Sequence, residues 1–257
     1  MPKKAKVGWE KAILQVIEKH NGIATLRDIY SEISLLIGKS NAQNSNHNIR
    51  GYLRRLKTAK KLIKQIGLST YALINVELKE NIFENINSRE FEKTFLNEIP
   101  KENVHGYVEG MLVELGNYSG YETYTPDRNV VFNSKPLSEL VSYNVIPNFS
   151  YPEVIDHAKQ IDVIWFRDKF PVKTFDVENS TDFTKAFLRA YQLRYYKTKF
   201  FMVSDSERKG TYDKKVKSQP FGLIEDNSDF LSYKDVYDLY KSAAIYNQKI
   251  INSSIFR

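Results

Sequence analysis

The sequence predicts two domains: a small, mostly helical N-terminal module and a larger α/β domain with a central mixed sheet flanked by helices. Three observations support this prediction. Excess positive charge is confined to the first third of the chain, the first 76 residues read as three helices and a hairpin, and strands alternate with helices later on. We assign residues 1–76 to the first domain, 77–103 to a linker helix and 104–257 to the second domain.

Charge is distributed unevenly along the chain. Residues 1–80 contain 15 Lys and Arg against 6 Asp and Glu, whereas the remaining residues contain 23 basic and 25 acidic side chains. The first third therefore carries +9 and the rest −2. Such asymmetry indicates a basic module that binds a polyanion, most simply nucleic acid. A basic surface that only confers solubility is the alternative.

Composition excludes several classes of protein. The chain has no cysteine, so it cannot form disulfides, which fits a reducing compartment. It has no apolar signal core and no apolar run of membrane-spanning length, and we expect a soluble, cytoplasmic protein without a membrane partner. Its four histidines show no zinc-ligand spacing, and no glycine-rich phosphate loop indicates an NTPase.

The first 76 residues show helical apolar periodicity followed by two short strand-like runs. Asn21 and Gly22 end the first helix because both tolerate a left-handed backbone, and Thr25 can cap the second. The predicted helices span residues 8–20, 26–36 and about 44–60, and the predicted hairpin pairs residues 62–66 with 69–74.

Three helices followed by a hairpin, with basic residues on the third helix, resemble a winged helix-turn-helix domain over about residues 7–76. The resemblance implies that the third helix enters the DNA major groove with its N-terminal residues nearest the bases. The side chains expected at base edges are Asn44, Asn46, His47 and Arg50. Those expected at phosphates are Arg54, Arg55, Lys57, Lys60, Lys61 and Lys64, although some are plain solvated surface.

The second domain is predicted to begin with a helix over residues 104–119 and a strand over 121–125. Residues 133–155 have three prolines and little periodicity, so they read as an insertion whose role the sequence does not decide. The later elements are a helix over 182–196 capped by Ser180 or Thr181, a strand over 199–203, a helix over 207–217, a strand over 221–224, and a helix over 233–246 with Val236, Leu239 and Tyr240 inward.

The most informative stretch is an acidic pair of strands. Residues 161–166 and 175–178 are both rich in strand formers, and the turn residues 167–169 can join them into a hairpin. Strand alternation places Asp176 and Glu178 on one face, and the hairpin can bring Asp162 to them. Three carboxylates suit Mg²⁺.

The alternative is a solvated hairpin with an acidic outer face. However, Asp162 shares its strand face with Ile164 and Phe166, which predicts that the carboxylate is buried. A buried carboxylate needs a ligand or a partner.

The order of elements and the acidic pattern resemble the PD-(D/E)XK nuclease superfamily over about residues 104–226. By that resemblance Asp162 and Asp176 are the two acidic positions of the motif. Glu109 is the acidic residue of the first helix, with Glu114 as its substitute. Gln192 and Tyr196 reproduce the Q-X-X-X-Y spacing of some members.

One position departs from the motif, because Glu178 stands where the superfamily usually has lysine. A minority of restriction enzymes show the same replacement. Physically, a second carboxylate can bind metal or accept a proton from water. Lys185 on the following helix can supply the missing charge, whereas strand parity points Lys173 away from Asp176. A catalytically inactive binding module is the alternative.

The resemblance implies a Mg²⁺-dependent type II restriction endonuclease, with Mn²⁺ as a substitute, that acts on double-stranded DNA. Asp162 and Asp176 would bind the metal, Glu178 would assist or activate water, and Glu109 would tune the site. Gln192 and Arg189 would orient the scissile phosphate or the helix. A homodimer and a cognate DNA methyltransferase are the implied partners. A DNA-binding regulator with an inactive nuclease fold and a repair or structure-specific nuclease are the alternatives.

Overall fold

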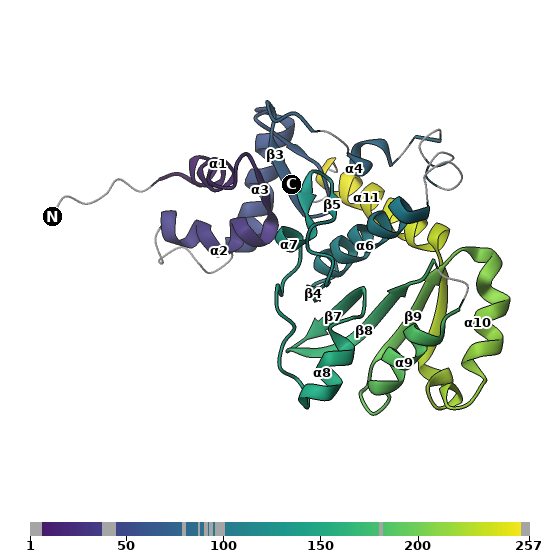
Figure 1. Cartoon of the computed structure of the whole chain (residues 1–257). Coiled ribbons are helices and arrows are strands. Elements are labelled where there is room, and N and C mark those ends of the chain that lie inside the picture. The colour runs from purple at the N-terminus through teal and green to yellow at the C-terminus, as the bar shows by residue number, and fades with distance from the viewer. Residues whose placement is uncertain are drawn as a thin grey trace. The chain divides into compact units, whose positions relative to one another are not determined.

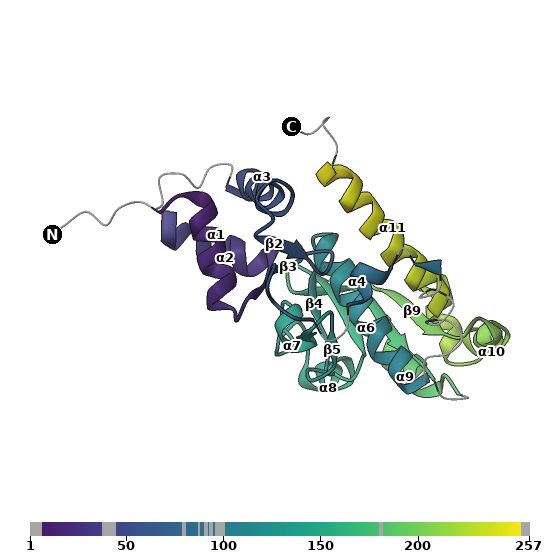
Figure 2. The same cartoon turned by 90° about the horizontal axis from the view of Figure 1, so that it is seen from above.

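A computed structural model describes residues 7–37, 45–78, 81–86, 88–89, 92, 95, 101–179 and 182–252, with the backbone alone for 45–47, 101–103 and 250–252. The chain divides into two compact units (Figures 1 and 2). Unit 1 comprises Met1–Glu84 with Tyr246–Arg257, and unit 2 comprises Asn85–Ile245. Within the described ranges, no helix combines the length and apolar character needed to cross a bilayer.

Unit 1 contains the predicted three helices and the predicted hairpin. Its elements, in chain order, are α1 (Trp9–Lys19), β1 (Ile23–Thr25), α2 (Leu26–Ile37), α3 (Ser45–Thr58), β2 (Ile63–Gln65) and β3 (Thr70–Leu73). The strands form an antiparallel sheet in the order β1-β3-β2, of which β1 was not predicted. The winged-helix interpretation of this unit stays a prediction.

Local signals in the sequence explain the helix ends of unit 1. Asn21 and Gly22 both have positive φ angles, 56° and 83°, as predicted for the end of α1. The Thr25 hydroxyl accepts from the Asp28 amide at 3.2 Å, and the Asp28 carboxylate accepts from the Thr25 amide at 2.8 Å. This reciprocal capping starts α2. The helices then pack around buried aliphatic side chains, including Ile13, Ile17, Ile33, Ile49 and Leu53.

Unit 2 is built on a mixed five-stranded sheet in the order β10-β9-β8-β7-β4. Its strands are β4 (Glu122–Tyr124), β7 (Val163–Arg167), β8 (Phe170–Val177), β9 (Lys199–Ser204) and β10 (Ser228–Ser232). The β4–β7 and β7–β8 pairs are antiparallel, whereas β8–β9 and β9–β10 are parallel. The predicted central mixed sheet is therefore confirmed.

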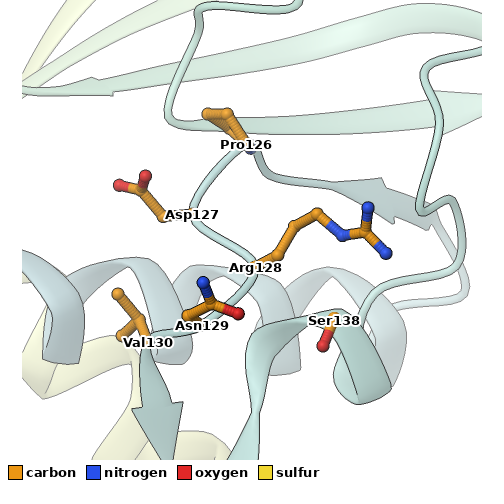
Figure 3. Close-up of a pocket in the computed structure, with 6 residues that line it drawn as sticks. All are labelled: Pro126, Asp127, Arg128, Asn129, Val130 and Ser138. Atoms are coloured by element: carbon orange, nitrogen blue, oxygen red, sulfur yellow. The ribbon is translucent and has the colours of Figure 1, made fainter.

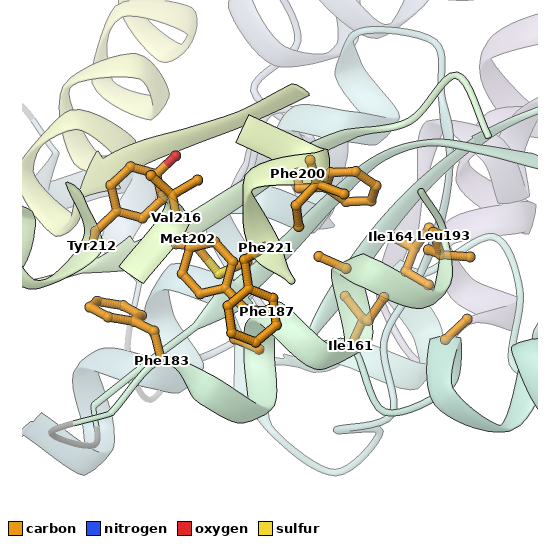
Figure 4. Close-up of a cluster of buried hydrophobic side chains, with 14 of the residues drawn as sticks. Ile161, Ile164, Phe183, Phe187, Leu193, Phe200, Met202, Tyr212, Val216 and Phe221 are labelled. Carbon is orange, nitrogen blue, oxygen red and sulfur yellow. The ribbon is translucent and has the colours of Figure 1, made fainter. Parts of the chain in front are cut away.

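Helices cover both faces of this sheet (Figure 1). α6 (Lys101–Tyr118) lies on one face, where the Trp165 indole N–H donates to the Leu112 carbonyl at 3.0 Å. α9 (Thr184–Gln192) covers the other face, where Phe187 packs with Ile164 and Met202 in a buried apolar cluster (Figure 4). Other elements of the unit are β5 (Val131–Phe132), β6 (Lys135–Pro136), α7 (Leu137–Leu140), α8 (Pro152–Ala158), η2 (Ser206–Arg208), α10 (Lys209–Val216), η3 (Phe221–Asn227) and α11 (Tyr233–Asn252). The last residues of α11 are assigned to unit 1, and α4 (Ile82–Asn85) includes the residues at which the chain passes from unit 1 to unit 2.

The structure corrects several predicted elements. Residues 221–224 were predicted as a strand but lie in the 3₁₀-helix η3, because Phe221 and Ile224, three residues apart, are buried on one side of it. The strand follows at β10, a polar edge segment with a weak sequence signal. Leu239 was predicted to face inward but is 53% exposed, whereas Tyr237 is buried.

Three other predicted stretches differ from the structure or lie partly outside the described residues. Residues 133–155, read as an insertion, contain β6, α7 and the first residues of α8, with Leu137 and Leu140 buried. The helix predicted over 182–196 is shorter, and its predicted caps, residues 180 and 181, lie outside the described residues. Much of the linker helix predicted over 77–103 also lies outside them.

Candidate active site

The predicted acidic hairpin is confirmed as β7 and β8. A two-residue turn at Asp168 and Lys169, with φ angles of 51° and 67°, joins the strands. Positive φ at both positions suits a tight hairpin because it matches the twist of the flanking strands. The pairing of Val163 with Phe175 puts Asp162 opposite Asp176, one position further along the same register. The Val177 amide donates to Asp162 Oδ2 at 2.6 Å and fixes that carboxylate.

Asp176 is the most deeply buried carboxylate of the hairpin, with 1% of its surface exposed. Arg189, from α9, donates from Nε to Asp176 Oδ1 at 2.7 Å and from Nη2 to the same oxygen. No described residue donates to Asp176 Oδ2, although this atom is buried. Burial raises the pKa of Asp176 against the opposing effect of Arg189, and Asp162 and Glu178 raise it further. Within the described part of the chain, one buried oxygen of Asp176 therefore has no hydrogen-bond partner, whereas buried polar atoms normally have one.

The backbone of Glu178 is held firmly just beyond the end of β8. Its amide donates to the Val203 carbonyl at 2.8 Å. Its own carbonyl accepts from Ser204 Oγ at 2.6 Å, Arg208 Nη1 at 2.9 Å and Tyr233 OH at 3.3 Å. Strand alternation directs the Glu178 side chain to the same face as Asp176.

A second group of ionisable side chains comes from α6 and from the loop after β4. Glu109 is completely buried, and neither of its carboxylate oxygens forms a hydrogen bond with the described residues. His105 lies one turn earlier on α6, with its Nε2 3.3 Å from Glu109 Oε1. The same Nε2 is 3.9 Å from an oxygen of Asp127, whose side chain is 46% exposed.

Two glycines on α6 let the Asp127 loop approach this closely. A Cβ on Gly106 would lie 2.9 Å from the Val130 side chain, and one on Gly110 would lie 2.2 Å from the Phe132 ring. Both distances are shorter than real Cβ contacts allow. The absence of side chains at these positions therefore permits the segment after Asp127 to pack directly on the helix that carries His105 and Glu109.

The two groups influence each other electrostatically. Burial lowers the pKa of His105, but Glu109, Asp162 and Asp127 outweigh it and raise the value to about 9. Burial raises the pKa of Glu109 to about 8, with His105 opposing. Burial also raises the pKa of Asp162, against His105, the Val177 amide and Arg189. Clustered groups with strongly shifted pKa values are typical of functional sites.

A surface hollow of about 390 Å³ adjoins Asp127 (Figure 3). It is lined by Pro126, Asp127, Arg128, Asn129, Val130 and Ser138. The loop is held by hydrogen bonds from the Ser138 amide to the Arg128 carbonyl at 3.0 Å and from the Val130 amide to the Asp127 carbonyl at 3.4 Å. The exposed guanidinium of Arg128 therefore stands on a loop whose backbone is fixed.

The other predicted site residues of unit 2 differ in how exposed they are and in what their side chains contact. Lys185 is exposed on α9, and Gln192, the last residue of that helix, is partly buried. Lys173 lies over the Trp165 ring at 5.2 Å, on the face opposite Asp176, as strand parity predicted. Glu114 accepts from the Tyr240 hydroxyl at 2.5 Å in a buried contact with α11, whereas Glu109 faces the ionisable side chain of His105. The Tyr196 hydroxyl donates to Ser150 Oγ at 2.5 Å.

The predicted DNA-binding residues lie in unit 1. Asn44 lies outside the described residues, as do the side chains of Asn46 and His47. Arg50 is exposed at the surface and donates to the Tyr30 hydroxyl at 3.0 Å. Arg54 and Lys64 are partly buried and Lys61 is exposed, whereas Lys57 donates to Gln65 at 3.0 Å, and Arg55 and Lys60 pair with Glu10.

Two residues of the site, His105 and Asp127, were missed from the sequence, whereas Glu109 was predicted. His105 lies four residues before Glu109 on a predicted helix, a spacing that places both on one face, and this signal could have been used. Asp127 has no local signal, because its approach to His105 depends on how the loop packs against α6. The sequence did predict Asp162, Asp176 and Glu178 as one group. The register of the hairpin puts the first two opposite each other, but the ligand atoms of all three do not lie within 4.8 Å of one another.

These pKa shifts predict that the metal-free protein loses stability as pH rises. The pKa of Glu109 is raised from 4.5 to about 8 and that of His105 from 6.5 to about 9, so the folded state binds more protons than the unfolded state between these values. The contribution of these two groups to the free energy of unfolding is therefore greatest below pH 4.5. It decreases as the pH rises to about 9. Thermal melts with EDTA at pH 6, 7, 8 and 9 measure the effect.

Glu109→Gln provides the control for this pH dependence. The amide has the shape of the carboxyl group but cannot ionise. The melting temperature of the variant should therefore vary less with pH than that of wild type over the same range. An equal pH dependence in wild type and variant would contradict the assignment to Glu109.

The comparisons with known proteins agree with the restriction-enzyme resemblance. Neither the curated proteins nor the solved structures gave a match. One family model did match, over residues 85–255, which is about two thirds of the chain and includes both groups of ionisable side chains. On this match, the chain belongs to the family described as the type II restriction enzyme NmeDI C-terminal domain.

Proposed function

We propose that the chain is a type II restriction endonuclease that hydrolyses phosphodiester bonds of double-stranded DNA with Mg²⁺, for which Mn²⁺ can substitute. One observation carries this proposal. The buried Asp176 Oδ2 has no hydrogen-bond donor among the described residues and stands beside Asp162 at the end of the β7–β8 hairpin. A buried carboxylate oxygen without a donor is costly unless a cation completes it.

The residues present fit a hard divalent cation. Asp162, Asp176 and Glu178 offer only oxygen ligands, which Mg²⁺ prefers. Asp162 Oδ2 is occupied by the Val177 amide and Asp176 Oδ1 by Arg189, so each carboxylate has its other oxygen for a metal. A bound Mg²⁺ would activate water and stabilise charge on the phosphate.

The side chains around the metal would have separate roles. Glu178 stands where lysine is usual in the PD-(D/E)XK nucleases that the sequence resembles. As a carboxylate, it would accept a proton from the attacking water or bind metal. Arg189 holds Asp176 and supplies positive charge. Lys185 and Gln192, on the same helix, contact DNA phosphate or orient the helix.

Unit 1 would bind the DNA that unit 2 cuts. The basic residues of α3 that are exposed or partly exposed include Arg50 and Arg54, and we assign Lys57 and Lys64 to phosphate as well. Asn44, Asn46 and His47 would lie nearer the bases. In this arrangement residues 1–76 form a winged helix-turn-helix domain, 77–103 a linker and 104–257 the nuclease domain. A homodimer would cut both strands, and a DNA methyltransferase would protect the host site.

Metal-dependent cleavage is the direct test. We expect purified protein to linearise or fragment a mixed DNA substrate with Mg²⁺ or Mn²⁺ and to leave it intact in EDTA. Sequencing the cut ends should give one recurring sequence. Cleavage that persists in EDTA would contradict the metal role. Salt-dependent DNA binding with no cleavage of any substrate would favour a DNA-binding protein with an inactive nuclease fold.

A further inference from the structure

His105, Glu109 and Asp127 form a group with ligand geometry of its own. One ligand atom from each lies within 4.8 Å of the other two. His105 and Glu109 project from one face of α6, and Asp127 comes from the β4–β5 loop that the glycines of α6 allow to pack there. The group belongs entirely to unit 2.

The distances suit a single ion. Two ligand atoms that bind one transition metal at roughly 2.0–2.2 Å lie at most about 4.4 Å apart. His105 Nε2 is 3.3 Å from Glu109 and 3.9 Å from Asp127. Only the Glu109–Asp127 separation can exceed this limit, and the Asp127 side chain is 46% exposed on a loop, so it has room to move closer.

Glu109 gives an independent indication of a ligand. Its side chain is completely buried beside His105, yet both oxygens lack a hydrogen bond with the described part of the chain. Its Oε1 pairs with His105 Nε2 at 3.3 Å, whereas no described residue contacts its Oε2 with a hydrogen bond or an ion pair. A buried carboxylate in this condition is stabilised by a cation at coordination distance.

We propose that His105, Glu109 and Asp127 bind a divalent transition-metal ion, for which Mn²⁺ serves as the probe, through ligands other than the carboxylates of the β7–β8 hairpin. The imidazole nitrogen decides the class of metal. Mg²⁺ and Ca²⁺ prefer oxygen ligands, whereas mixed imidazole and carboxylate sets favour transition metals. This site rests on its own geometry and does not require that the protein cut DNA.

The ion would act next to the hairpin carboxylates. The charge of His105 already influences Asp162, and that of Asp127 does so in the opposite direction. A divalent ion between His105 and Asp127 would therefore place positive charge beside Asp162. It would also provide a partner for Glu109 Oε2, to which no described residue donates.

Titration of the metal-free protein with Mn²⁺, followed by isothermal calorimetry and by the Mn²⁺ electron paramagnetic resonance signal, tests the proposal. We expect His105→Ala and Asp127→Asn each to weaken one class of Mn²⁺ site by roughly 10-fold or more, a loss that even outer-shell partners of a metal can cause. Asp176→Asn should leave that class unchanged. Ca²⁺ should not compete for it. His157→Ala, which changes an exposed histidine on α8, is the matched control.

Using both His105→Ala and Asp127→Asn separates a loss of metal binding from a loss of folding. Asp127 is 46% exposed, so Asp127→Asn should melt like wild type without metal even where His105→Ala does not. Mn²⁺ binding of wild-type strength and stoichiometry in both variants would overturn the proposal and leave His105 as an ion-pair partner of Glu109. DNA cleavage is not part of this readout, so an inactive protein would contradict the proposed nuclease function without affecting the outcome here.

Discussion

Asp176→Asn is expected to reduce DNA cleavage by roughly 10³-fold or more while DNA binding stays close to wild type. The amide keeps the shape of the side chain, and its oxygen can still accept from Arg189. It cannot supply the negative charge that a divalent cation needs. Asp176 is also the carboxylate with the buried oxygen that lacks a donor among the described residues, so the loss should fall on metal binding and catalysis.

The experiment compares cleavage with Mg²⁺ and DNA binding with Ca²⁺, the second by fluorescence anisotropy. Asp168→Asn is the matched control, because Asp168 is exposed in the turn of the same hairpin and asparagine also tolerates its positive φ. That variant should cut like wild type. Cleavage by Asp176→Asn within a few-fold of wild type would show that the hairpin is not the catalytic centre.

The part of the site that could be predicted from the sequence is the part that depends on local pattern. Asp176 and Glu178 share a face because side chains alternate along any strand. Asp162 lies opposite Asp176 because a two-residue turn at Asp168 and Lys169 fixes the register of the hairpin. Both inferences need only the spacing of residues in one continuous segment, and β7 and β8 have the predicted pairing.

The part that could not be predicted depends on packing between distant segments. Asp127 meets His105 because Gly106 and Gly110 let a loop lie on α6, and this contact has no signal in the sequence near Asp127. The run at 221–224 shows the same limit. Four apolar residues can form a buried strand or one buried turn, and only the packing of Phe221 against α9 decides for the turn.

The choice between Lys185 and Arg189 is a third case of this kind. Both lie on one face of α9, four residues apart, so helical spacing alone does not show which one reaches Asp176. The side chain of Lys185 is exposed, whereas that of Arg189 is only 17% exposed and contacts the carboxylate. Of these two basic side chains, the structure therefore brings that of Arg189 to Asp176.

Arg189→Ala is accordingly expected to lower cleavage by roughly 10²-fold, the effect typical of removing one preorganised electrostatic group. The guanidinium provides both hydrogen bonds that Asp176 Oδ1 receives from the described residues, and it opposes the rise in the pKa of this carboxyl group. Without it the pKa of Asp176 rises further. A proton then competes with the metal up to higher pH, and the acid limb of the pH–rate profile should move to higher pH.

The shift of the acid limb distinguishes an effect of Arg189 on the pKa of Asp176 from a general loss of structure. Arg189→Lys keeps the charge but not the two-nitrogen geometry, so it should retain more activity and show a smaller shift of the pH profile. Lys185→Ala, one turn earlier on the same helix, should leave the profile in place, although it can raise KM if Lys185 contacts phosphate. Equal melting temperatures of Arg189→Lys and wild type would show that its fold is intact. If instead Lys185→Ala moved the pH profile and Arg189→Ala did not, the positive charge of the site would have to be assigned to Lys185, and the contact between Arg189 and Asp176 would be structural only.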